Sequence, residues 1–344
     1  MAINPAIIQR FADALNFRRP DRAPIWEMLQ LPAAFRHFAP GVPFPQCAVI
    51  ACERLGIDAT YGFYDVPAEG TPRADHAVVA GQTVWHTQPL FRTPEELSDW
   101  RPTPFDERRL EEQLLADYDA RQRLCGDNLL YLPQNGGFEF IPGYDTETFL
   151  VFSEALGTDL PSLERFWDAQ MAMARMRNAV TARHIPVPVI QCCIDVAYNT
   201  GLIVHPDLLR EHFFPRFKEV IAPLKDAGIK VIWHSDGDIS SVLDDAIASG
   251  IDGIDPLDAG ASSMDLAAIR QRYPRLILVG GIGRDHILRF GTPEEVRAEV
   301  RRCLSAAGPH GGYIVQCADG QIAPDCPLEN VMAYLDEARI GFGV

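Results

Sequence analysis

The sequence has few basic residues for its length and no apolar run long enough to span a bilayer. Its 344 residues include 31 Lys and Arg against 47 Asp and Glu, a formal net charge of −16. Nucleic-acid phosphates and anionic membranes both bind clustered basic side chains, so we expect neither as a partner. The first residues lack the basic start and apolar stretch of a secretory signal, and we expect a cytoplasmic protein.

Paired cysteines and a nucleotide-binding glycine loop are also missing. The eight cysteines are scattered and form no CxxC pair, which is typical of reduced, mostly buried thiols. Gly280-Gly281-Ile282-Gly283 matches part of a dinucleotide fingerprint, but it does not follow the first strand of a βαβ unit. Hydrophobic residues make up 47% of the chain, which indicates a globular protein with a large core.

Short apolar runs alternate with amphipathic stretches from about residue 186 onward. The expected strands are Val187–Gln191, Lys230–Trp233, Gly253–Ile254, Leu276–Val279 and Gly312–Gln316, and the expected helices are Pro206–Ala227, Ser240–Ser249, Asp265–Arg272, Pro293–Ala307 and Pro327–Ala338. Strand–helix alternation with short loops predicts parallel strands. Five such units without a nucleotide loop favour a (β/α)₈ TIM barrel over an open doubly wound sheet.

The N-terminal half is less regular. Expected strands are Pro24–Met28, Ile57–Phe63 and Asn128–Pro133, and expected helices are Phe105–Arg123 and Pro161–His184. Residues 77–88 alternate around Ala80-Gly81, which predicts a hairpin protruding from the barrel. We therefore predict an α/β chain, residues 1–344, that forms one distorted barrel domain with an N-terminal hairpin and helical elaboration.

Barrel enzymes take their catalytic residues from the C-terminal ends of the strands. The polar residues at these positions include Glu27, Cys193 and Asp255, and the strongest candidates are His234, Asp236, Asp195, Tyr198 and Cys317. Each candidate also has a structural interpretation: His234 as a core histidine, Asp236 as a helix cap, Asp195 as a turn former, Tyr198 as a packing ring and Cys317 as an inert thiol. His234, Asp236 and Cys317 together offer the mixed nitrogen, oxygen and sulfur donors of a catalytic zinc site. In a metal-free alternative, Asp195 or Asp236 acts as an acid or base while His234 orients the substrate.

Several ordered motifs carry a family resemblance. They are Trp233-His234-Ser235-Asp236-Gly237-Asp238, Ile251-Asp252-Gly253-Ile254-Asp255-Pro256, Gly280-Gly281-Ile282, residues 291–296, residues 311–314 and Pro327-Leu328-Glu329-Asn330, with Arg19-Pro20-Asp21-Arg22-Ala23-Pro24 as a looser match. In this order they resemble the uroporphyrinogen decarboxylase-like superfamily. That superfamily includes the decarboxylase of haem synthesis and zinc-dependent methyltransferases that use corrinoid proteins and thiols. The resemblance implies a distorted (β/α)₈ barrel and a homodimer.

The resemblance favours the methyltransferase branch. The decarboxylase follows its first strand with an arginine-rich segment that holds a polyanionic tetrapyrrole, whereas this chain has Glu27 and no paired arginines there. The zinc methyltransferases carry His-x-Cys-Gly and a second, later Cys. Here His234-Ser235-Asp236-Gly237 replaces the first Cys with Asp, and Cys317 and Asp319 lie near the second position. A branch with the same His-Ser-Asp-Gly motif and an Asp-x-Ala-Tyr segment, matched by residues 195–198, is more similar to the methyltransferases.

Three functional hypotheses follow. The first is a methyltransferase or demethylase that acts on a small methylated substrate or a corrinoid-linked methyl group, with zinc as an expected cofactor. The second is a lyase in the decarboxylase style, which acts on a small carboxylate. The third is a barrel that binds a small ligand or a corrinoid without turnover. The sequence has no Asp-x-His-x-x-Gly corrinoid segment, so cobalamin would arrive free or on a partner corrinoid protein.

Overall fold

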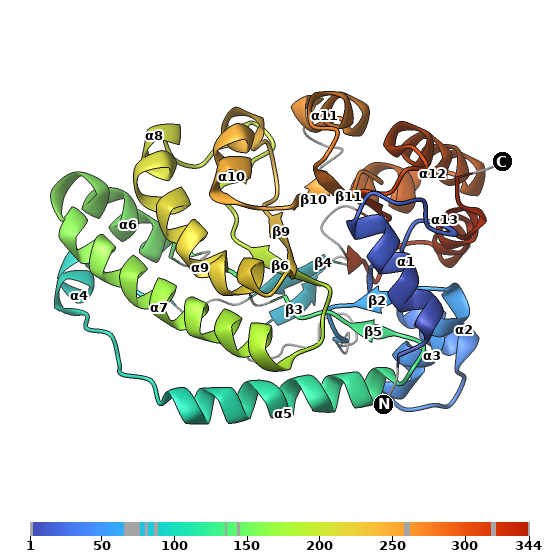
Figure 1. Ribbon diagram of the computed structural model, residues 1–344, viewed down its shortest axis with the longest axis horizontal. Coiled ribbons are helices and arrows are strands. Elements are labelled where there is room, and N and C mark those ends of the chain that lie inside the picture. Colours follow the sequence, from blue (N-terminus) through green and yellow to red (C-terminus); the bar gives the residue numbers. More distant parts are fainter. Residues whose placement is uncertain are drawn as a thin grey trace.

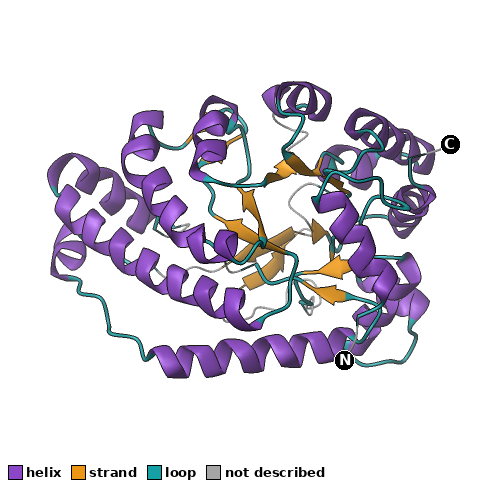
Figure 2. Cartoon of the chain, viewed as in Figure 1, coloured by secondary structure: helices purple, strands orange, loops and turns teal. Residues whose placement is uncertain are grey.

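The computed structural model describes residues 3–64, 76–79, 82–85, 89–134, 136–142, 145–257, 262–317 and 321–342. Helices lie outside a central set of strands (Figures 1 and 2). The helices are α1 (Pro5–Leu15), α2 (Pro32–Phe38), α3 (Gln46–Leu55), α4 (Pro94–Asp99), α5 (Glu107–Cys125), α6 (Thr146–Thr158), α7 (Leu160–His184), α8 (Pro206–Leu208), α9 (Phe214–Asp226), α10 (Leu243–Ser249), α11 (Leu266–Arg272), α12 (Pro293–Ala307) and α13 (Leu328–Ile340). Short 3₁₀ and π turns are η1 (Leu209–Phe213), η2 (Ser240–Val242), η3 (Ser262–Met264) and η4 (Arg284–Leu288).

The C-terminal half contributes a five-stranded parallel sheet. Its order is β12 (Tyr313–Ile314), β11 (Ile277–Gly280), β10 (Gly253–Leu257), β9 (Lys230–His234) and β6 (Val189–Cys193). Every adjacent pair in it is parallel. Helical crossovers separate successive strands along the chain, which is the arrangement that parallel pairing requires.

The N-terminal strands extend this array. Parallel bridges join Ile25 to Val315, just after β12, and Trp26 to Ala59 in β2 (Ala59–Thr60). The segment continues into β1 (Met28–Leu29), which pairs with β13 (Gln321–Ile322). β2 pairs with β5 (Leu130–Tyr131), and Gly136 N donates to Gln191 O of β6 at 3.2 Å. The result is a distorted α/β fold of the (β/α)₈-barrel type, as the sequence predicts.

Two antiparallel pairs lie outside this array. The predicted hairpin is confirmed, with β3 (His76–Val79) pairing antiparallel to β4 (Gln82–Trp85). A smaller pair, β7 (Ala197–Tyr198) and β8 (Gly201–Leu202), was not expected. The predicted helix over residues 206–227 is interrupted by the π turn η1 before Pro215.

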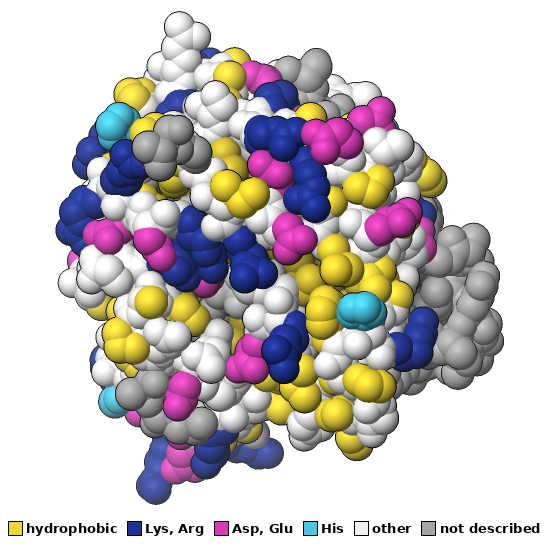
Figure 3. All heavy atoms as spheres, turned by 90° about the vertical axis from the view of Figure 1, so that its right-hand side faces the viewer, with side chains coloured by type: hydrophobic (Ala, Val, Ile, Leu, Met, Phe, Trp, Pro, Cys, Tyr) yellow, Lys and Arg dark blue, Asp and Glu magenta, His cyan; other side chains and the backbone are white. Residues whose placement is uncertain are grey.

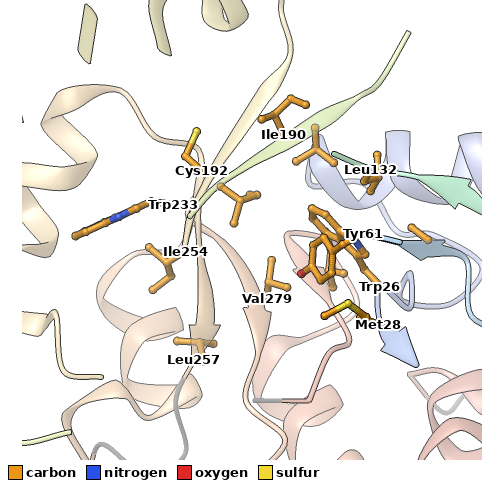
Figure 4. Packing of buried hydrophobic residues seen from close by; sticks show 14 of the residues in the cluster. Trp26, Met28, Tyr61, Leu132, Ile190, Cys192, Trp233, Ile254, Leu257 and Val279 are labelled. Carbon is orange, nitrogen blue, oxygen red and sulfur yellow. The ribbon is translucent and has the colours of Figure 1, made fainter. Parts of the chain in front are cut away.

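The core fills the space between and around the strands. Trp26 and Tyr61 pack inside the array with ring centroids 4.8 Å apart, while Trp233 points away from them toward the helices (Figure 4). There Trp233 contacts the rings of Phe213 and Phe217. This alternation along β9 decides which of its side chains reach the barrel interior.

An ion-pair cluster fixes the start of the first strand. Asp58 is buried and accepts hydrogen bonds from Arg10, Arg22 and the Ile25 amide. Arg10 also pairs with Asp21. The Arg-Pro-Asp-Arg-Ala-Pro motif therefore anchors the N-terminal segment to the strand array. The residues of this ion-pair cluster lie on α1 or at the N-terminal ends of strands, which is the end opposite to barrel active sites.

The outer helices carry charges of both signs. On the face that includes α12, basic and acidic side chains are interspersed, with hydrophobic side chains on one flank (Figure 3). Arg301 pairs with Glu294 and Glu337, and Arg297 also reaches Glu337. Among the described residues, no helix is both long and apolar enough to cross a membrane.

Candidate functional site

Three neighbouring strands place Cys193, His234 and Asp255 in one row. Cys193 is the register partner of His234 in the β6–β9 pair, and Asp255 is the register partner of His234 in the β10–β9 pair. Register partners in a sheet point to the same face, so the thiol, the imidazole and the carboxylate lie side by side near the C-terminal ends of their strands. His234 is the last residue of β9, so the strand ends one residue later than the predicted Lys230–Trp233.

The strand alternation turns this row inward. Gln191 lies two residues before Cys193 on β6, and its side chain reaches Tyr61 and Asp255 inside the barrel. Cys192 between them is fully buried on the opposite face, where it lies beside Gly136. The barrel interior therefore receives Cys193 but not Cys192.

Asp255 orients the imidazole of His234. Its Oδ2 lies 3.3 Å from His234 Nδ1, and its side chain is fully buried. Gln191 donates to the same oxygen, and Tyr61 Oη lies 3.4 Å from it. Tyr61 in turn accepts hydrogen bonds from Gln191 and Gln316. With Nδ1 directed at Asp255, the other nitrogen, Nε2, faces Asp195 and Asp236, each with an oxygen 3.8 Å away.

The surroundings of His234 favour its charged form. Burial lowers the pKa of His234, but negative charge at Cys193 and the contact with Asp255 outweigh it and raise the pKa well above its usual value.

Backbone contacts join the Asp-Val-Ala-Tyr segment to the His-Ser-Asp-Gly motif. Asp236 N donates to Asp195 Oδ1 at 3.0 Å, and Val196 N donates to Ser235 Oγ at 3.0 Å. Gly237 has φ +80°, and a Cβ atom there would lie 2.5 Å from the Tyr198 carbonyl. Glycine is thus required by both conformation and close approach.

Capping at the end of this motif falls to a different aspartate. Asp238 Oδ1 accepts from Ser240 N at the start of η2. The carboxylate of Asp236 lies near His234, with an oxygen 3.8 Å from Nε2.

Cys317 lies in a second buried cluster, with Glu27 and Tyr334. Glu27 accepts hydrogen bonds from Cys317 N at 2.6 Å, from the Cys317 thiol at 3.4 Å and from Tyr334 Oη. Burial raises the pKa of Glu27 to about 8, against the lowering effect of these donors. Burial also raises the pKa of the Cys317 thiol well above its usual value. Asp319, near the second cysteine position of the zinc methyltransferases, lies outside the described residues.

A cavity of about 600 Å³ opens beside the His234 row. Its described lining includes Cys193, Asp195 and Tyr198, together with residues from the loop after β5, from α6 and from α7. Cys193 is exposed, whereas His234 is 6% exposed. Cavities of this size suit small organic ligands. Two of the predicted site residues, Asp195 and Tyr198, thus lie in the wall of the cavity, and His234 lies next to them.

The donor set fits a zinc ion, with two of the three predicted ligands exchanged. Cys193, Asp195 and His234 place a sulfur, an oxygen and a nitrogen within 4.8 Å of one another, the one such group found among the described residues. A tetrahedral zinc with bonds of 2.0–2.3 Å spaces its ligand atoms by about 3.3–3.8 Å, so small side-chain movements would suffice. The sequence pattern predicts Cys317 as the sulfur donor and Asp236 as the oxygen donor, and here Cys193 and Asp195 take these places. The structure does not bring Cys317 into this group.

Cys193 and Asp255 are polar strand-end residues in the sequence, but its pattern alone does not single them out as site residues. Period-two alternation along β6 was the available signal, because it places Cys193 on the same face as Gln191. For Asp255 the signal was its place two residues after Gly253, at the end of a buried strand. Tyr61 and Gln316 gave no signal, since only the barrel packing brings them to Asp255.

Comparisons with known proteins agree with this fold. Residues 188–340 match the family model described as uroporphyrinogen decarboxylase (URO-D). The matched range includes the His-Ser-Asp-Gly motif at residues 234–237. A solved methyltransferase from Methanosarcina mazei has a TM-score of 0.68 over 97% of this chain and 98% of its own, at 17% identity. The curated proteins contain no match. Over residues 188–340 the chain is thus similar to the uroporphyrinogen decarboxylase family, and its whole fold is similar to that of the Methanosarcina mazei methyltransferase.

Proposed function

We propose that the chain is a methyl-transfer enzyme that acts on a small methylated substrate. The observation that supports this most is the cluster of Cys193, Asp195 and His234, which combines three kinds of donor beside a ligand-sized cavity. The fold shared with a methyltransferase is consistent with the proposal. The acceptor is a thiol or a corrinoid that reaches the site free or on a partner protein.

In this proposal Cys193, Asp195 and His234 would hold a zinc ion, and Asp236, whose carboxylate lies near His234, would border the site. Bound zinc keeps a thiol deprotonated at neutral pH, which makes its sulfur a methyl acceptor. Asp255 orients His234 through Nδ1, as carboxylates commonly do for metal-binding histidines. Tyr198 lines the entrance and, at 61% exposure, contacts the incoming substrate.

Elemental analysis of the purified protein tests the metal site. We expect about one zinc per chain in the wild type and in Cys317→Ala, and its loss in His234→Ala and Cys193→Ser. Cys317→Ala is the matched control, because it removes a buried thiol that the sequence also suggested as a ligand. Zinc that persists in Cys193→Ser but is lost in Cys317→Ala would contradict the ligand set.

A methyl-transfer assay tests the reaction. Methylcobalamin and 2-mercaptoethanol serve as donor and acceptor, and the loss of the methylcobalamin absorbance reports turnover. We expect turnover with the wild type and at least a hundred-fold loss with His234→Ala. Absence of both zinc and turnover would overturn the proposal. It would favour the second hypothesis, a metal-free lyase with Asp195 as the acid or base. Asp195 and Arg177 line the same cavity and suit a small carboxylate there.

A further inference from the structure

The wall of the cavity beside Cys193 is negatively charged. Among its described lining residues are three carboxylates, of Glu139, Asp145 and Asp195, and one basic side chain, of Arg177. The guanidinium of Arg177 donates to the Gly137 carbonyl at 3.0 Å. Asp195 is a zinc ligand in the proposed function, and the remaining carboxylates of Glu139 and Asp145 exceed the guanidinium by one charge, so their field favours a cation over an anionic ligand.

Asp145 adds to this field from a fixed position. Its Oδ1 caps α6 by accepting from Thr148 N at 2.7 Å, which holds the carboxylate in place. Its Oδ2 is buried and has no hydrogen-bond partner within the described part of the chain. A buried carboxylate oxygen without a donor is costly, and a nearby cation would lower that cost.

Aromatic rings form much of the remaining wall, from Phe138, Phe140, Phe149 and Tyr198. Phe140 stacks on Trp167 with centroids 4.6 Å apart, and Phe138 stacks on Phe213 at 5.6 Å. These contacts hold the two inner rings rigidly in the core. The faces of aromatic rings attract cations, and rings combined with carboxylates bind quaternary ammonium groups, which have no N–H to donate.

We propose that this cavity binds a small methylated onium ion, a quaternary ammonium or a sulfonium, as the methyl donor. This inference rests on the proposed methyl transfer and names its substrate class. The acceptor thiolate, or a Co(I) corrinoid, forms a bond to the methyl carbon as the carbon–nitrogen or carbon–sulfur bond breaks. The electron pair of the broken bond stays on the leaving nitrogen or sulfur, which departs as a neutral amine or sulfide without needing a proton.

Isothermal titration calorimetry with choline tests the inference, and 3,3-dimethylbutan-1-ol serves as its uncharged isostere. We expect choline to bind the wild type at least ten-fold more tightly than the alcohol, and to bind more weakly as salt is added. Equal affinity for both probes would overturn the inference. So would the absence of choline binding at choline concentrations up to about 10 mM.

Two variants test the two parts of the wall. Asp145→Asn keeps the helix cap, because Asn caps as well as Asp, but removes the charge; we expect choline affinity to fall about three-fold. Phe149→Leu keeps an apolar side chain without the ring face; we expect a fall of about three- to ten-fold. Leu150→Ala is the matched control, since Leu150 is 63% exposed and does not line the cavity. Unchanged affinity in both Asp145→Asn and Phe149→Leu would refute the assigned wall.

The two proposals fail in different ways. Choline binding without methylcobalamin turnover would overturn the proposed function but leave a cation-selective cavity. Turnover of methylcobalamin without choline binding would leave methyl transfer intact and overturn the onium substrate. Transfer of a deuterated methyl group from choline to 2-mercaptoethanol, followed by mass spectrometry, then checks the complete reaction.

Discussion

Replacing Gly237 by alanine should separate two costs that coincide at this residue. Gly237 has φ +80°, a conformation that costs a residue with a Cβ about 1–2 kcal/mol. An added Cβ would also lie 2.5 Å from the backbone of Tyr198, which cannot rotate away as a flexible side chain can. Relieving such an overlap in a packed region costs typically about 1–3 kcal/mol more. We therefore expect Gly237→Ala to lower the free energy of unfolding by about 2–5 kcal/mol.

Gly228→Ala is the matched control. Gly228 has φ +75°, but no atom lies within 4 Å of the position its Cβ would take. Its substitution should cost only the conformational part, about 1–2 kcal/mol, in part offset by a stiffer unfolded chain. Urea unfolding followed by circular dichroism measures both variants.

The same substitution should also affect the site. Moving Gly237 away from Tyr198 displaces the Asp236 amide, which donates to Asp195. Zinc affinity should therefore fall in Gly237→Ala and stay unchanged in Gly228→Ala. Equal losses of stability in the two variants, together with unchanged zinc affinity, would refute the argument that Gly237 holds the two motifs together.

Three further substitutions test other parts of the structure. Glu27→Gln should remove a pH dependence of stability. Because the pKa of Glu27 is about 8 in the folded protein and 4.5 in the unfolded chain, Glu27 holds its proton only in the folded state between these pH values, and the free energy of unfolding of the wild type falls by at most about 5 kcal/mol as the pH rises from 4.5 to 8. Urea titrations at pH 5.5 and 8.5 would show this fall in the wild type and its absence in Glu27→Gln. Asp255→Asn should weaken zinc binding about 10–100-fold, measured by competition with a chelator, because it loosens the orientation of His234; an unchanged zinc affinity would mean that Asp255 does not position the imidazole. Asp58→Ala should lower the free energy of unfolding by about 3–5 kcal/mol, since it leaves Arg10 and Arg22 without their buried partner; a loss below 1 kcal/mol would show that water replaces it.

The sequence determined the fold class and most of the strand positions. Buried parallel strands are short apolar runs, so local composition locates them, and polar residues at their ends mark the active-site edge. This reasoning found β9 and β10 nearly in place and selected His234, Asp195 and Tyr198. The capping box at Thr292 and the glycine Gly250 that ends α10 are equally local features, because each depends only on residues within one helical turn.

The tertiary structure alone decided which strand-end residues meet. Cys193 and Cys317 both lie at the ends of buried strand segments, and nothing local distinguishes them. The register of β6 against β9 places Cys193 beside His234, whereas Cys317 bridges to Ile282 and its amide and thiol contact Glu27. Likewise, the aromatic and acidic wall of the cavity comes from segments far apart in the sequence. Registers and long-range packing arise from the whole strand array, so a single strand cannot encode which residues become neighbours.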